Sequence, residues 1–140
     1  MPGQPAPGSN PLLTIDCTQL NVADRPGDLP SPLIHKAGQP FDVSTNFVLA
    51  EALAPWIASL PSVQYTVRYF FESIGPGPDG VLATVGPKPL GGLTTQGPAQ
   101  TRATVSLPTP GTYKLSVVVS FGGAPPITGF FEGPMIEIFA

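Results

Sequence analysis

The chain has 140 residues, of which only 11% are charged, and its formal net charge is −3 with a pI of about 4.8. Soluble domains typically have about 25% charged residues, and the six Lys and Arg residues here stand singly between Arg25 and Lys114. Because nucleic-acid binding needs a clustered basic surface, this pattern excludes a nucleic-acid partner. The chain is 41% hydrophobic, so its 20 prolines and 16 glycines are interpreted as breaks between short strands rather than as signs of disorder.

The first eleven residues are rich in proline and glycine, and we expect an extended arm over residues 1–11 ahead of one domain over 12–140. The start of the chain has neither the basic nor the apolar region of a secretory signal. Nowhere does an apolar run approach the about 18 residues of a membrane span. We therefore expect no membrane partner, and a location in the cytoplasm or in a virion.

Proline lacks the N–H that a β-ladder requires, so proline-free windows indicate where strands can form. These windows are 12–25, 41–54, 62–75, 79–86, 99–107, 111–124 and 135–140. Most alternate apolar and polar residues, as half-buried strands do, and the alternation is clearest from Tyr113 to Phe121. Helical periodicity occurs only around residues 51–60, where Pro55 and Pro61 limit a helix to one or two turns. About seven short strands predict an antiparallel two-sheet β-sandwich, with a barrel as the main alternative.

Two segments resemble bacterial and phage immunoglobulin-like domains. Residues 37–43 are similar to the entry of their second strand, and residues 107–117 resemble their E–F corner and sixth strand. In that family a tyrosine hydroxyl bonds back to the backbone near the corner, and Tyr113 stands at the matching position. The resemblance covers roughly residues 12–140 and implies an immunoglobulin-like sandwich. It implies no function, because this fold supports many.

Residues that could carry chemistry are few and scattered. Cys17 is the only cysteine, so neither an intrachain disulfide nor a thiolate zinc site can form, and we interpret Cys17 as a buried strand residue. His35 is the only histidine, and its proline-rich surroundings predict a solvated loop side chain. The acidic residues nearest to a cluster, Asp16, Asp24 and Asp28, do not have the spacing of a calcium loop. We therefore expect no catalytic residue, no metal, no cofactor and no enzymatic activity.

Apolar side chains occur where the pattern predicts loops, and loops usually carry polar residues. The candidate interface residues are Trp56, Ile57, Leu60, Ile127, Phe130 and Phe131, together with Pro2, Pro5 and Pro7 of the arm. Aromatic residues are enriched in interface cores, although these side chains could instead plug the ends of the sandwich.

From these residues we predict contact with other protein subunits and a homo-oligomer. The most specific hypothesis is a capsid decoration protein of a bacterial virus, docked onto a larger particle. The alternative is a module that binds a glycan or small ligand on Trp56, Tyr65 or Tyr69.

Overall fold

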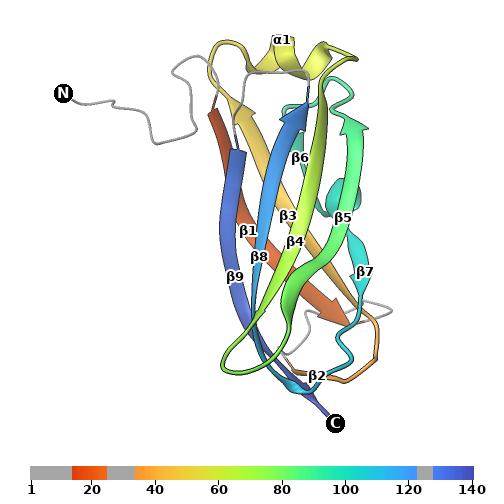
Figure 1. Ribbon diagram of the computed structural model, residues 1–140. Coiled ribbons are helices and arrows are strands. Elements are labelled where there is room, and N and C mark those ends of the chain that lie inside the picture. Colours follow the sequence, from red (N-terminus) through yellow and green to blue (C-terminus); the bar gives the residue numbers. More distant parts are fainter. Residues whose placement is uncertain (1–13, 25–33, 123–127) are drawn as a thin grey trace, which may run out of the picture.

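The computed structural model describes residues 14–24, 34–122 and 128–140, which form a sandwich of two β-sheets (Figure 1). The four-stranded sheet contains β1 (Thr14–Asp24), β3 (Phe41–Ala50) and β6 (Thr95–Gln96) in that order, and β7 (Ala103–Val105) also pairs with β3. The five-stranded sheet has the order β2 (Ile34–Lys36), β9 (Thr128–Phe139), β8 (Gly111–Gly122), β4 (Gln64–Ser73), β5 (Asp79–Pro89). The prediction of an all-β, immunoglobulin-like sandwich is confirmed.

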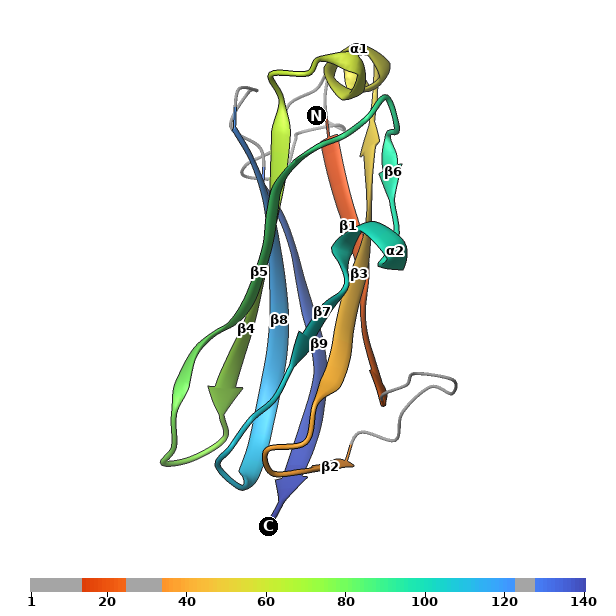
Figure 2. The same cartoon turned by 90° about the vertical axis from the view of Figure 1, so that its right-hand side faces the viewer.

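The two sheets are seen edge-on in Figure 2, with α1 (Ala54–Ser59) at one end and β2 at the other. A second short helix, α2 (Pro98–Thr101), lies between β6 and β7. All strand pairs described are antiparallel except β2 with β9, which is parallel. No helix of the described residues is long and apolar enough to cross a membrane.

The core lies between the sheets and is built from alternate residues of each strand. In β8 the inward positions are Tyr113, Leu115, Val117 and Val119, and each is almost completely buried. The positions between them are half-buried and face outward. This is the period-two pattern that the sequence predicts.

Three strands differ from the prediction. β9 begins at Thr128 rather than near residue 135, because its register against β8 shifts between Glu132 and Met135 and leaves Pro134 outside the regular ladder. β5 continues through Pro87 and Pro89 because it is an edge strand and has one unpaired side. β2 forms from a stretch expected to be a loop, and its three residues pair with the end of β9.

Two glycines of β9 allow β1 to pack closely against it. A Cβ atom on Gly129 would lie 3.0 Å from Cδ1 of Ile15, and one on Gly133 would lie 3.0 Å from side-chain atoms of Leu20. Real Cβ atoms rarely make contacts this short. Glycine at both positions therefore lets one side of the sandwich close.

In the four-stranded sheet, the side chain of Thr101 pairs with the backbone of β3 where a neighbouring strand is missing. β3 pairs with β6 at Phe47 and Val48 and with β7 at residues 41–43, and α2 interrupts the neighbouring strand in between. There the Thr101 hydroxyl accepts a hydrogen bond from the N–H of Thr45 (3.0 Å) and lies 2.6 Å from its carbonyl oxygen. Thr101 thus satisfies both backbone groups of a buried residue, as a ladder partner would.

The tyrosine corner is present. Tyr113 is buried at the start of β8, and its hydroxyl donates a 2.7 Å hydrogen bond to the carbonyl oxygen of Thr109. The resemblance implied this bond, which ties the loop before β8 to the strand itself.

Replacing Thr101→Val should destabilise the fold, because the N–H and carbonyl of Thr45 would remain buried without partners. Each buried unsatisfied group costs about 1–3 kcal/mol, so the loss of partners for two groups should lower the free energy of unfolding by about 2–6 kcal/mol in urea denaturation. The control is Thr112→Val, which removes an exposed bond to Glu137 and should cost well under 1 kcal/mol, as roughly expected at the surface. Equal losses in the two variants would contradict this role for Thr101.

Replacing Tyr113→Phe should lower the free energy of unfolding by about 1 kcal/mol, because one well-formed hydrogen bond is lost. Tyr65→Phe is the matched control: Tyr65 is equally buried, but its hydroxyl lies 3.5 Å from the carbonyl oxygen of Gln100. That bond is long, so its removal should cost less. A larger loss for Tyr65→Phe than for Tyr113→Phe would overturn the account of the corner.

Candidate functional site

The outward side of the five-stranded sheet carries its side chains in rows that the strand register defines. The middle row is Glu132, Ser116, Phe70 and Val81, from β9, β8, β4 and β5 respectively. The row on one side is Phe130, Val118, Arg68 and Thr84, and the row on the other side is Met135, Lys114, Glu72 and Asp79. We call these twelve residues the outer face.

Five of the twelve side chains are apolar. Val81, Phe130 and Met135 are 54%, 56% and 58% exposed, and Phe70 and Val118 are half-buried. A single exposed apolar residue is normal on a protein surface, but several on one face mark a contact site.

The charged residues of the outer face are unevenly paired. Lys114 Nζ lies 2.6 Å from Glu132 Oε2, and this hydrogen-bonded ion pair raises the pKa of Lys114. Glu72 and Asp79 stand directly opposite each other on β4 and β5, where like charges repel. Arg68 makes no salt bridge within the described part of the chain. The face therefore has an exposed cation and a carboxylate pair, four residues apart along β4.

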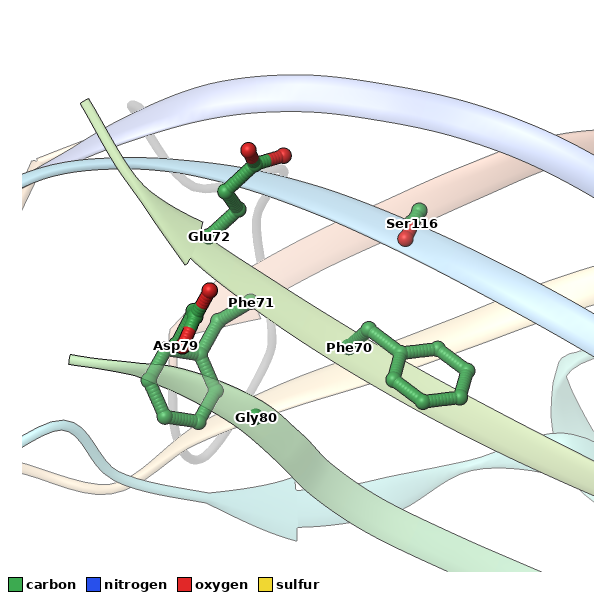
Figure 3. Close-up of a pocket in the computed structure, with 6 residues that line it drawn as sticks. All are labelled: Phe70, Phe71, Glu72, Asp79, Gly80 and Ser116. Carbon is green, nitrogen blue, oxygen red and sulfur yellow. The ribbon is translucent and has the colours of Figure 1, made fainter.

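A shallow depression of about 360 Å³ lies in the outer face (Figure 3). Phe70, Phe71 and Glu72 of β4 line it, together with Asp79 and Gly80 of β5 and Ser116 of β8. Figure 3 shows the Glu72 and Asp79 side chains on neighbouring strands, with the Phe70 ring pointing away from both of them along β4. The depression thus combines an aromatic ring with two carboxylates, a lining suited to a cationic group.

The structure separates the predicted interface residues. Trp56 is 59% exposed and Phe130 is exposed on the outer face, so both are accessible to a partner. Ile57 is buried in the core, which corrects its assignment to a contact surface, because it lies on the buried side of α1 together with Ala54 and Ala58. Leu60 and Phe131 are partly buried and pack against the core. The remaining candidates, Ile127, Pro2, Pro5 and Pro7, lie outside the described residues, as does the arm.

Phe130 and Phe131 do not form a loop, contrary to the prediction. They are consecutive residues of β9, so one faces solvent and the other faces the core.

His35 and Cys17 are both buried. The prediction of a solvated His35 is wrong, because β2 places its ring on that of Phe41 with centroids 4.5 Å apart. The interpretation of Cys17 as a buried strand residue is confirmed, and its Sγ lies 3.3 Å from Oγ1 of Thr45. Burial raises the pKa of the Cys17 thiol. Among the described residues, no group of three or more His, Cys, Asp and Glu is placed to hold a metal ion.

Several residues of the outer face, above all Phe70, were not predicted from the sequence as contact residues. Alternation places Phe70 outward in β4, between Tyr69 and Phe71, which both face the core. An aromatic residue at an outward position was the available signal. The exposure of Met135 depended on the register shift in β9, which the alternation does not reveal.

No protein-family model matches the chain, and no curated protein matches it. Among solved structures, the superoxide reductase (neelaredoxin) from Ignicoccus hospitalis is 16% identical, with a TM-score of 0.47 over 87% of this chain and 81% of that one. The CARDB domain of a Pyrococcus furiosus protein, solved in complex with di-metal ions, is 9% identical, with a TM-score of 0.40 over 96% of this chain and 98% of that one.

These matches bear on two predictions. The hypothesis of a capsid decoration protein, with its ligand-binding alternative, is contradicted because the similar structures are superoxide reductases and a CARDB domain. The expectation that the chain is not an enzyme stays a prediction. At these TM-scores the likeness assigns no activity to this chain.

Burial predicts that the Cys17 thiol is unreactive in the native protein. The thiolate is the reactive form, and a pKa raised above the ordinary value of 9.0 lowers its population. Reaction with Ellman's reagent at mildly alkaline pH should be at least roughly tenfold slower in the native protein than in urea, because the thiol is both protonated and enclosed. A native rate equal to the unfolded rate would contradict the buried position.

Proposed function

We propose that this chain is a self-associating protein module and that its outer face is the contact surface between copies. The observation that carries the proposal is the cluster of Phe70, Val81, Phe130 and Met135 on one side of one sheet. Fully burying one such side chain contributes about 1.5–3 kcal/mol to the free energy of binding. A partner that covers all four therefore contributes several times that amount, which offsets the translational and rotational freedom lost on association.

Low charge favours association between identical chains. With a net charge of −3 over 140 residues, two copies repel each other only weakly. The outer face itself contains two basic and three acidic residues, and one acid is already paired with Lys114.

The outward side of the sheet, with the outer face at its centre, approaches the size of a specific contact. Four strands about 4.8 Å apart and about ten residues long, at about 3.4 Å per residue, give this side of the sheet about 19 by 34 Å. The projected area of the whole side is therefore about 650 Å², somewhat below the about 800 Å² per partner that stable interfaces of protein complexes bury.

The strand edges are less suited to pairing with another chain than the face is. β5 ends in Gly86-Pro87-Lys88-Pro89, and the two prolines lack the N–H groups that an added strand would need. On the other side of the sheet, β9 packs against β1 and pairs with β2. Contact through the face is therefore favoured over strand addition.

The second accessible apolar region lies at the end of the sandwich that carries α1. Trp56 and Leu93 are both exposed there, and the loop containing Leu93 is joined to α1 by a hydrogen bond from the N–H of Gly92 to the carbonyl of Ala58. These are two side chains on a helix and a loop, whereas the outer face carries five on four adjacent strands. We therefore place the contact on the outer face.

Sedimentation analysis over a range of protein concentrations tests self-association. The average mass should rise above the 14.5 kDa of one chain as the concentration increases. Phe130→Ser and Met135→Ser should each weaken association by roughly tenfold or more, as the loss of one buried apolar side chain implies.

Trp56→Ser is the matched control, because Trp56 is as exposed as Met135 but lies off the outer face. It should leave association unchanged. A mass of one chain at every concentration would reject self-association. Weakening by Trp56→Ser with no effect of Phe130→Ser would move the contact to the α1 end.

A further inference from the structure

We infer that the outer face pairs with the outer face of a second copy about a two-fold axis over Phe70, so that Arg68 of each copy enters the acidic depression of the other. This inference rests on the self-association proposed above and specifies its geometry. It follows from the order of charged and apolar residues along the strands.

A two-fold axis that lies between two facing sheets, perpendicular to their strands, places each strand over its own equivalent in reverse direction. If the axis passes over the middle row, each residue of this row faces the identical residue of the second copy. The row of Arg68 then faces the row of Glu72 in the second copy, and the reverse holds on the other side of the axis. An isologous contact of this kind is the commonest form of homodimer.

The rows match under this operation. Phe130 faces Met135, Thr84 faces Asp79, and Val118 faces the apolar stem of Lys114 in the second copy. In the middle row, Phe70 and Val81 each face an identical apolar residue. These pairs place apolar groups on apolar groups and a hydroxyl on a carboxylate.

The charged pairs match as well. Arg68 and Glu72 are each two residues from Phe70 along β4, about 6.8 Å on either side, so the axis superimposes the position of one on that of the other. Facing sheets cross at about 30°, which displaces these positions by about 4 Å, and an arginine side chain spans that offset. Glu132 faces its own equivalent, but its charge is compensated by the ion pair with Lys114.

The chemistry of the depression fits a guanidinium group. Asp79 and Glu72 stand opposite each other, so the isolated chain keeps two like charges together at the surface. A planar cation between them removes that repulsion and donates hydrogen bonds to both carboxylates. Arg68 of the second copy is the cation that the two-fold operation brings there.

Charge reversal tests the pairing by sedimentation. Arg68→Glu and Glu72→Arg should each weaken self-association by at least roughly tenfold, because each reversal places like charges together at two symmetric contacts. The double variant, with both reversals in one chain, should restore association to within a few-fold of the unchanged protein. Arg102→Glu is the matched control, since Arg102 is exposed and lies off the outer face, and it should have no effect.

The outcomes separate the two proposals. If the unchanged protein is a monomer throughout, self-association is rejected, and the pairing with it. If the protein associates but the single reversals act no more strongly than Arg102→Glu, or the double variant fails to recover, the pairing is overturned while self-association stands.

A second measurement does not depend on charge. Ser116 lies in the middle row and faces its own equivalent, whereas Ser120 is four residues further along β8 and faces residue 112 of the second copy. Ser116→Cys should therefore form dimers with a short bis-maleimide, and Ser120→Cys should not. Equal cross-linking of the two variants would exclude an axis over Phe70.

Discussion

The uninterrupted pairing of β4 with β8 is the constraint on which the rest of the structure depends. Ten residue pairs run in register from Gln64 with Gly122 to Ser73 with Tyr113. Because side chains alternate across a strand, a slip of one residue would exchange the buried and exposed faces of one strand relative to the other. In this sheet the register shifts lie in the flanking pairs, between β4 and β5 and between β8 and β9. One central pair thus sets the core on one side of the sheet and the outer face on the other.

Much of this architecture was predictable from the sequence, because prolines and the alternation of apolar and polar residues determine the structure of the segments in which they occur. The windows from residue 41 and from residue 111 became β3 and β8, and Tyr113 forms the corner bond that the family resemblance implied. The failures have non-local causes. His35 is buried because β2 pairs in parallel with β9, which is distant in sequence. Phe130 lies in a strand because a register shift accommodates Pro134, and no local pattern announces such a shift.

The candidate site was predictable only in part for the same reason. Phe130 was identified as a contact residue, but the residues beside it come from three other strands. Their proximity depends on sheet order, which alternation within single strands does not determine. The sequence showed that charged residues are few and that apolar residues also occur outside the expected core. The fold brings five apolar side chains together on one face, beside the carboxylates of Glu72 and Asp79.

The central claim is that two outer faces meet with Arg68 of one copy at Glu72 of the other. Mixing the two single variants tests it most directly, because a chain carrying Arg68→Glu and a chain carrying Glu72→Arg are complementary to each other and repulsive to themselves. Sedimentation should show each variant alone as a monomer and the equimolar mixture as a dimer of twice 14.5 kDa. A mixture that remains monomeric, while the unchanged protein dimerises, would contradict the claim.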